Sequence, residues 1–233
     1  MKAAIMQPYV FPYIGYFQLV SAVDIFVFYD DVNYIKKGWI NRNRILVNNE
    51  ASLFTIPVLK ASQNKLIHEI KLGIDEKWLR QFYSTLEHNY KKAPHYHETI
   101  LLIQQVLNQQ TTSISELAIA SIELISNYLK IPTSFDKSST NYQTSKGMDK
   151  AERLIEICKL NHVKTYINPS GGKELYNKSS FKAENVELFF IENKISSYKQ
   201  FNTDFVGGLS IIDVLMFNSQ VQVKDLLTQY ELK

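Results

Sequence analysis

An aromatic segment near the start of the chain has the residue types needed to bind a ring-shaped ligand. It reads Gln7-Pro8-Tyr9-Val10-Phe11-Pro12-Tyr13-Ile14-Gly15-Tyr16. Its two prolines fix φ and remove backbone donors, which makes the segment stiff. Aromatic side chains in a stiff loop can stack on a base or a sugar ring. We therefore predict ligand contacts from Gln7, Tyr9, Tyr13 and Tyr16; the alternative is that these rings pack beneath neighbouring loops.

A second segment concentrates positive charge. From residue 36 to residue 49 there are four Lys or Arg side chains and no acid. Because Arg offers phosphate oxygens a fork of donors and Lys offers a point charge, this segment suits a diphosphate. The predicted binding residues are Asn33, Lys36, Lys37, Asn41 and Arg42. The alternative is a solvated edge hairpin whose lysines discourage aggregation.

Three side chains are candidates for moving a proton. Asp30 and Asp31 follow an apolar run, and carboxylates there can accept a proton from an amine or position a metal. Two carboxylates alone are a weak metal signal, so we predict no metal ligand. His95 forms a close pair with His97 and can act as a general base. The alternatives are turn caps for the aspartates and a surface loop for the histidines.

A third set of polar residues lies in two later loops that precede predicted helix starts. Hydroxyls, glycines and lysines at such places allow backbone amides to point at an anion. The predicted binding residues are Ser139, Lys146, Ser170, Gly172 and Lys173. The Gly-x-x-x-x-Gly-Lys-Ser/Thr spacing of a nucleotide-binding P-loop is absent.

The order of predicted elements indicates how these segments are positioned. A strand at 3–6, a helix at 14–22 and a strand at 25–29 form a parallel βαβ unit. Strand-like segments at 45–47, 53–58 and 67–72 predict an antiparallel insertion on the sheet, and residues 75–130 predict about three helices, the last beginning at a Ser113 and Glu116 capping box. Beyond residue 132 the elements expected are a helix (150–160), a strand (163–168), a helical turn (172–176), a strand (186–191) and two helices (209–217, 221–230).

This order predicts an α/β fold, a mainly parallel Rossmann-like sheet with a helical insertion and a small antiparallel β insertion. Residues 1–233 show no linker-like stretch and are expected to form a single domain. In such sheets ligands bind beyond the carboxyl ends of the strands. We therefore expect the tyrosine-rich turn and the arginine-bearing hairpin to converge on one pocket.

Composition excludes several classes of protein. A chain of 233 residues can bury about 70% of its unfolded surface, and the single cysteine, Cys158, excludes an internal disulfide and a cysteine-rich zinc site. A net charge of +3 is too small for a protein that coats nucleic acid. No signal peptide or membrane-spanning apolar run is visible, so a cytoplasmic location without a membrane partner is expected. The oligomeric state is left open.

The chain resembles the WbqC-like family over nearly its whole length. The resemblance is carried by Gln7-Pro8-Tyr9, the segment 11–17, Asp24, Asp30-Asp31-Val32, Asn41-Arg42-Asn43 and Pro57-Val58, and later by the Ser139 loop, 150–158, Tyr166, Ser170-Gly171-Gly172 and 209–213. Members of this family often lie among genes for O-antigen and other surface polysaccharides. The resemblance therefore implies polysaccharide biosynthesis more firmly than it implies a reaction.

Together, the residues and the resemblance predict an enzyme that transfers an acyl or aminoacyl group to the amine of a nucleotide-linked amino sugar. One alternative is a non-catalytic nucleotide-sugar-binding protein. Another is a degenerate nucleotidyltransferase or an ATP-dependent ligase, because the first loop resembles in shape the His-x-Gly-His loop of nucleotidylyltransferases. Tyr13 and Tyr16 replace those histidines, and a neutral phenol supplies no positive charge. The cofactor is unknown, with ATP and Mg²⁺ expected only for the ligase.

Overall fold

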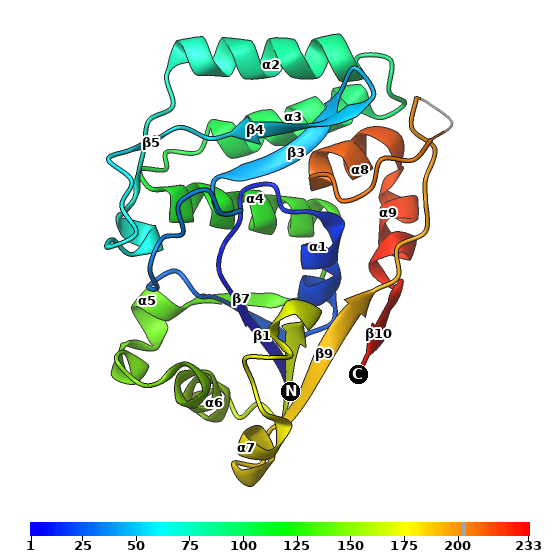
Figure 1. Ribbon diagram of the computed structural model, residues 1–233. Helices are drawn as coiled ribbons and strands as arrows, with labels where there is room; N and C mark the ends of the chain where they lie inside the picture. Colours follow the sequence, from blue (N-terminus) through cyan, green and yellow to red (C-terminus); the bar gives the residue numbers. More distant parts are fainter. Residues whose placement is uncertain (202–203) are drawn as a thin grey trace.

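A computed structural model describes residues 1–201 and 204–233. Its centre is a six-stranded sheet in the order β10-β9-β8-β1-β2-β7 (Figure 1). The strands are β1 (Lys2–Met6), β2 (Ile25–Phe28), β7 (Ser134–Lys137), β8 (Thr165–Pro169), β9 (Glu187–Asn193) and β10 (Tyr230–Leu232). Neighbours pair in parallel except β10, which is antiparallel to β9. The mixed α/β fold with a mostly parallel sheet is confirmed.

The strand order follows the doubly wound Rossmann arrangement. The first three strands of the sheet run outward from β1 through β2 to β7, and the next three run the other way through β8 and β9 to β10. The direction of winding therefore reverses between β1 and β8. In open sheets of this type a crevice forms at this switch point, beyond the carboxyl ends of the two strands.

Alternation along the buried strands divides the apolar residues between two cores. In β2 all four residues are buried; Phe26 and Phe28 join one core, and Ile25 and Val27 join the other. The first core is covered by α1 (Ile14–Ser21), α4 (Ile114–Tyr128), α8 (Ile211–Phe217) and α9 (Gln220–Leu227). The second is covered by α6 (Lys150–Leu160) and α7 (Lys178–Ala183). Both faces of the sheet are thus covered by helices.

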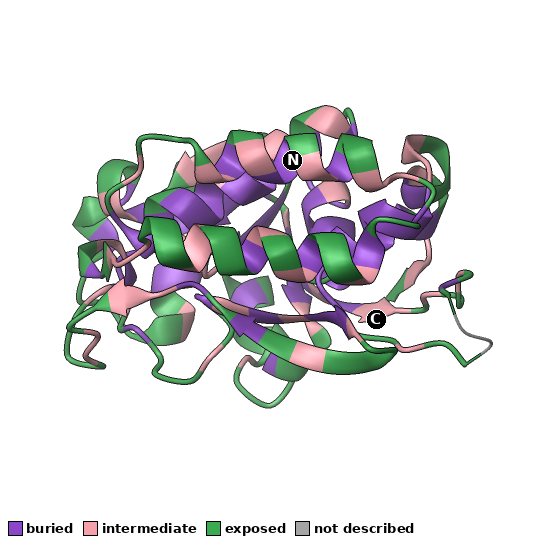
Figure 2. Cartoon of the chain, turned by 90° about the horizontal axis from the view of Figure 1, so that it is seen from above, coloured by how far each residue is buried: buried purple, intermediate pink, exposed green. Residues whose placement is uncertain are grey.

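A long insertion separates β2 from β7 and lies beyond the carboxyl ends of the strands (Figure 1). It contains β3 (Arg42–Val47), β4 (Glu50–Thr55), β5 (Val58–Leu59), β6 (Lys71–Leu72), α2 (Glu76–Tyr90), α3 (Tyr96–Leu107) and α4. The three expected helices are present, and Ser113 caps α4 with Glu116 as predicted. Figure 2 shows exposed and buried residues alternating along the helices of this layer.

Three local expectations are corrected. The predicted antiparallel strands do not join the main sheet; β3 pairs with β4 and β5 with β6 in two separate sheets. The segment expected as a strand at 67–72 begins with a 3-10 turn (Ile67–Glu69), so only β6 is extended. The last predicted helix ends at Leu227 rather than at residue 230, because Tyr230 pairs with Asn193 and starts β10. In the described part of the chain, no helix combines the length and the apolar character required to cross a bilayer.

Candidate functional site

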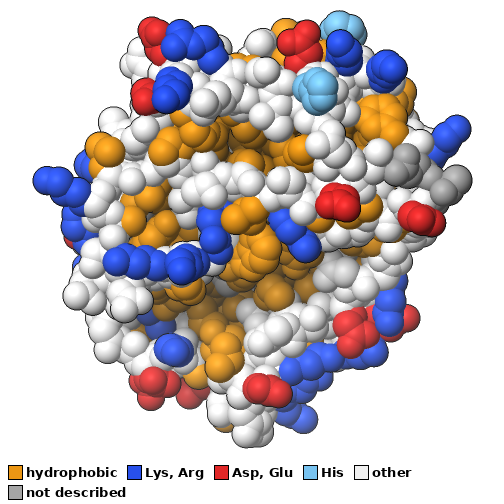
Figure 3. Space-filling view, turned by 45° about the horizontal axis from the view of Figure 1, so that its top comes forward, with side chains coloured by type: hydrophobic (Ala, Val, Ile, Leu, Met, Phe, Trp, Pro, Cys, Tyr) orange, Lys and Arg blue, Asp and Glu red, His pale blue; other side chains and the backbone are white. Residues whose placement is uncertain are grey.

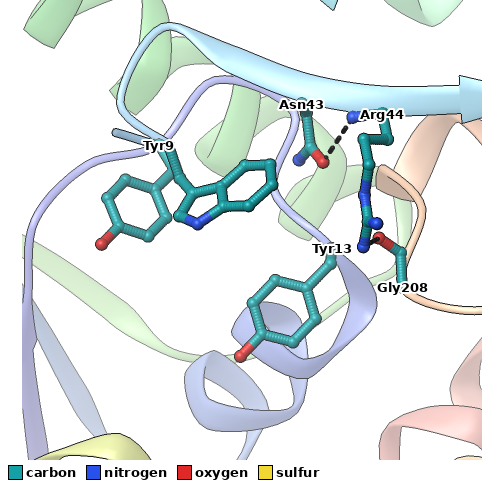
Figure 4. Close-up of a pocket in the computed structure, with 6 residues that line it drawn as sticks. Tyr9, Tyr13, Asn43, Arg44 and Gly208 are labelled. Carbon is teal, nitrogen blue, oxygen red and sulfur yellow. Dashed lines mark hydrogen bonds between the residues drawn. The ribbon is translucent and has the colours of Figure 1, made fainter. Parts of the chain in front are cut away.

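The tyrosine-rich turn and the arginine-bearing hairpin meet at a pocket of about 280 Å³, here called the aromatic pocket (Figure 4). Its lining residues come from the loop after β1, the segment that leads into β3, and the loop before α8: Tyr9, Tyr13, Trp39, Asn43, Arg44 and Gly208. Trp39 is 47% exposed and Tyr13 is 37% exposed. Three aromatic side chains and one guanidinium therefore line a cavity that is open to a ligand.

Hydrogen bonds join the two segments that form this pocket. The backbone amide of Val10 donates to the Ile40 carbonyl at 3.0 Å, and Asn43 Nδ2 donates to the Phe11 carbonyl at 2.8 Å. Ser210 Oγ, which caps α8, donates to the same Phe11 carbonyl at 2.7 Å. The convergence expected from the sequence is thus built from contacts between the turn, β3 and the start of α8.

The charge in the aromatic pocket comes from Arg44. Its Nη2 donates to the Gly208 carbonyl at 2.9 Å, and its Cζ lies 5.8 Å from the centre of the Trp39 ring. Arg44 Nε is buried and has no hydrogen-bond partner within the described chain. A buried guanidinium donor without a partner costs free energy; the part of the guanidinium that lines the pocket can bind an anionic ligand.

The tyrosines of this pocket stay protonated at neutral pH. Burial, with the neighbouring Tyr13, raises the pKa of Tyr9 to about 12, and burial also raises the pKa of Tyr13. Tyr16 is fully enclosed, which raises its pKa well above the usual phenol value, and its hydroxyl donates to the Gln7 carbonyl at 2.9 Å. Tyr9 and Tyr13 can therefore stack and hydrogen-bond as neutral phenols. Tyr16 does not line the pocket, and its hydroxyl stabilises the loop after β1 through the Gln7 carbonyl.

A second, larger pocket of about 470 Å³ lies at the carboxyl ends of β1, β2 and β8. Because it includes the ends of β1 and β8, where the winding of the sheet reverses, we call it the switch-point pocket. Its lining is mainly apolar with a few amide, phenol and amine groups: Ile5, Met6, Gln7, Tyr29, Val32, Ile35, Lys150, Leu154, Asn168, Pro169, Gly171, Gly172, Leu175 and Tyr176.

Two loops contribute to both pockets. The loop after β1 places Gln7 in the switch-point pocket and Tyr9 in the aromatic pocket. The loop after β2 places Ile35 in the switch-point pocket and Trp39 in the aromatic pocket. The exposed Lys36 and Lys37 lie between these two residues in the sequence. Figure 3 shows the result on the surface: a hollow lined by hydrophobic side chains with Lys and Arg beside it.

Asp30 and Asp31 lie below this surface in a buried polar network. Asp30 accepts from the Ser139 amide at 3.0 Å and from Ser139 Oγ at 2.8 Å. Asp31 accepts from Ser138 Oγ and forms an ion pair with Arg153, whose Nη2 lies 2.6 Å from Asp31 Oδ2. Both carboxylates hold the loop after β2 to α5 (Ser138–Asn141), and Asp31 also joins it to α6; neither carboxylate lines the two pockets.

The remaining predicted site residues are divided among several places. His95 precedes α3, where its amide donates to the Met216 carbonyl at 3.1 Å and its ring faces Glu98. Asn41 is buried, with Nδ2 donating to the Ile56 carbonyl at 2.8 Å, and Arg42 Nε donates to the Gly38 carbonyl at 3.0 Å. Lys173 pairs with Glu192 at 3.1 Å. Outside both pockets lie the exposed side chains of Asn33, Lys36, Lys37, Lys146, Ser170 and Lys173.

Of the predicted binding residues, Tyr9 and Tyr13 line the aromatic pocket, and Gln7 and Gly172 line the switch-point pocket. Several lining residues were not among the predicted ones, namely Trp39, Asn43, Arg44, Gly208, Tyr29, Lys150, Asn168 and Tyr176. Trp39, Asn43 and Arg44 lie inside the cationic segment at residues 36–49. Within the described chain, no group of three or more His, Cys, Asp or Glu side chains could hold a metal ion.

The fold and the two pockets define a doubly wound α/β protein with ligand-sized cavities at the carboxyl edge of its sheet. The chain belongs to the WbqC-like protein family, whose profile matches residues 7–225. It is similar to a Mycobacterium tuberculosis protein described as "Uncharacterized protein Rv1507c", with 31% identity over 230 residues and 97% of each chain covered. No solved structure matches the chain significantly.

Proposed function

We propose that this protein binds a nucleotide-linked amino sugar in the biosynthesis of a bacterial surface polysaccharide and transfers an acyl or aminoacyl group to the sugar amine. The observation that carries the binding step is the aromatic pocket, in which Tyr9, Tyr13 and Trp39 line the same cavity as Arg44. The base or sugar ring stacks on these side chains. Arg44 binds the diphosphate, and Lys36 and Lys37 lie on the same loop as Trp39.

The contacts proposed for the aromatic pocket each contribute to the free energy of binding. Stacking of a base on an aromatic side chain contributes about 1–3 kcal/mol, and a hydrogen bond to a charged group contributes about 1.5–3 kcal/mol. Two stacked rings and the Arg44 contact together contribute about 3.5–9 kcal/mol of gross binding free energy, part of which offsets the entropy of association.

A second candidate function is a protein that binds the nucleotide sugar without altering it. This alternative is favoured by one observation: among the described residues that line the aromatic pocket, none is a carboxylate or an imidazole. Asp30 and Asp31 are engaged in the buried network, and His95 lies beside Glu98 at α3. The transferase therefore requires that the leaving group of the acyl donor carry away the amine proton.

Thermal unfolding with a panel of nucleoside diphosphates and nucleoside diphosphate amino sugars tests the binding step. A ligand at a hundredfold its Kd adds about 2.7 kcal/mol of stability, which is about 5–11 °C in Tm for a chain of this length. Arg44→Lys keeps the charge but loses the fork, and we expect about tenfold weaker binding. Arg80→Lys, at an exposed arginine on α2, is the matched control. The proposal fails if no member of the panel raises Tm.

Mass spectrometry of the sugar separates the two functions. Incubation with an acyl thioester and the bound amino sugar should add the mass of the acyl group under the transferase proposal. A ligand that binds with the expected dependence on Arg44 but is recovered unchanged with every donor supports the binding protein instead.

A further inference from the structure

The switch-point pocket has a lining that differs in kind from that of the aromatic pocket. Seven of its side chains are aliphatic, a thioether or proline: Ile5, Met6, Val32, Ile35, Leu154, Pro169 and Leu175. A free sugar or a diphosphate would lose its hydration against such walls without replacement hydrogen bonds. The pocket is therefore suited to a ligand with a substantial hydrocarbon part.

Two exposed side chains at this pocket support the same conclusion. Ile35, from the loop after β2, is 51% exposed, and Leu175, from the loop after β8, is 65% exposed. Both line the same cavity although they come from different loops. Large apolar side chains that gather around one cavity mark a surface that a ligand covers.

The polar groups of the pocket are few, and one of them is a cation. Lys150, at the first turn of α6, lines the cavity and is exposed. Gln7 and Asn168 supply amides from the ends of β1 and β8. In the described chain no Asp or Glu side chain lines this cavity, so its charge complements a single negative group at one end of an apolar ligand.

The position of Gly172 keeps the floor of the pocket in place. A Cβ at this residue would lie 1.9 Å from Asn168 Nδ2 and 3.3 Å from the Tyr176 ring. A side chain at this position would require Asn168 to move, so glycine lets the 3-10 turn (Ser170–Gly172) pack against the end of β8 with Asn168 in place. By contrast, a Cβ at the adjacent Gly171 would meet no atom within 4 Å. The shape of the pocket near Gly172 is thus fixed by packing, whereas there is free space next to Gly171.

We propose that the switch-point pocket binds an aliphatic acyl chain, as the free carboxylate or as its thioester, with the hydrocarbon chain among Ile35, Leu154 and Leu175 and the carboxyl or carbonyl oxygen at Lys150. The volume of about 470 Å³ lies in the range of pockets that enclose small ligands. Because Gln7 and Tyr9 are two residues apart on the shared loop, this ligand lies next to the aromatic pocket. That this ligand supplies the transferred acyl group rests on the proposed function, whereas its binding in the switch-point pocket does not.

A series of straight-chain carboxylates from butanoate to octanoate, measured by calorimetry on the full chain without nucleotide, tests the proposal. Each methylene buried in the pocket should tighten binding about fourfold, which corresponds to about 0.8 kcal/mol. Lys150→Gln should weaken every member of the series by a similar factor and leave the dependence on chain length unchanged. Lys164→Gln is the control for the loss of one positive charge, because Lys164 is an exposed lysine just before the first residue of β8, whereas the pocket lies at the carboxyl end of that strand.

Variants of the two exposed apolar residues of the pocket, Ile35 and Leu175, provide the second half of the test. The double variant Ile35→Ser with Leu175→Ser changes only exposed positions, so it should fold, and it should reduce the gain per methylene. Leu160→Ser, at a 48% exposed leucine of α6 outside the pocket, is its control. The proposal is overturned if affinity does not depend on chain length, if the double variant binds the series as the parent does, or if nucleoside diphosphates displace octanoate by direct competition. Failure of nucleotide sugars to bind, with the chain-length dependence intact, would contradict the proposed function alone.

Discussion

The buried ion pair between Asp31 and Arg153 gives a direct test of whether Asp31 is structural or catalytic. The side chains are 3% and 5% exposed, and their charged atoms lie 2.6 Å apart. Arg153 Nε also donates to Ser145 Oγ at 3.2 Å, and its guanidinium lies 4.7 Å from the centre of the Tyr29 ring. Arg153→Met removes all three interactions and leaves the Asp31 carboxylate buried without its counter-charge.

The expected loss of stability is large. Removal of one partner of a buried pair costs about 3–5 kcal/mol, because the remaining charge is not compensated. For a domain of 233 residues this corresponds to a fall in Tm of about 6–20 °C. Asp31→Asn in the Arg153→Met background neutralises the remaining charge, so the double variant should be more stable than Arg153→Met alone by more than about 1 kcal/mol.

Urea unfolding followed by the fluorescence of Trp39 and Trp78 measures these differences. Arg80→Met, at a surface pair with Glu76 whose side chains are 74% and 90% exposed, should cost less than about 1 kcal/mol and serves as the control. The reasoning is refuted if Arg153→Met is no more destabilising than this control. It is also refuted if the loss of stability in the double variant equals the sum of the losses measured for Arg153→Met and Asp31→Asn separately. Either result would reopen Asp31 as a free carboxylate available for proton transfer.

Two further predictions concern buried titratable groups. Burial raises the pKa of Cys158 to about 12, so the folded protein should not react with a thiol-specific disulfide reagent at pH 8 and should react stoichiometrically in urea; rapid labelling of the native protein would contradict this. Burial also raises the pKa of Asp213, opposed by hydrogen bonds from Tyr198, Gln200 and Tyr90. Its contribution to stability is therefore fully present below the ordinary aspartate pKa of 3.8 and is lost as pH rises through the raised pKa. The stability of Asp213→Asn relative to the parent should therefore increase as pH rises from below 3.8 toward neutrality, whereas the exposed control Asp225→Asn should show no such trend in urea unfolding.

Local sequence signals were sufficient for the elements nearest the switch point. The apolar runs of β1 and β2 and the helix between them predicted a parallel βαβ unit, and the structure pairs Ala3 with Ile25 and Met6 with Phe28 in parallel. Ser113 and Glu116 predicted the start of α4 because a capping box satisfies backbone amides within one turn. In each case the determining interactions lie within a few residues, where spacing alone reveals them.

Long-range partners explain what the sequence could not show. Asp31 was predicted to be catalytic because it follows an apolar run and can accept a proton, whereas its ion-pair partner Arg153 lies 122 residues away. The strand β10 consists of three residues that pair with β9, so the pattern at the chain end was interpreted as a continuing helix. Asn41 resembled a ligand-binding amide, whereas its Nδ2 donates to Ile56 across the hairpin. Polar groups of this kind are satisfied by the tertiary fold.

The geometry of the aromatic pocket depends on Phe11, a residue with no direct part in the lining. Its φ of 42° is unusual for a residue other than glycine and costs about 1–2 kcal/mol. Three hydrogen bonds hold it there: Asn43 Nδ2 and Ser210 Oγ donate to its carbonyl, and its amide donates to Ser121 Oγ at 3.1 Å. These partners belong to β3, the start of α8 and α4.

The reversal of the chain at Phe11 is what allows Tyr9 and Tyr13, on either side of it, to line the same cavity. The insertion and the C-terminal helices thus determine the positions of rings carried by the first loop. This dependence places Tyr9 and Tyr13 in the same cavity as Arg44, which neither the stiffness of the loop nor the charge of the hairpin produces alone. It also explains why the pocket includes residues as far apart in the chain as Tyr9 and Gly208.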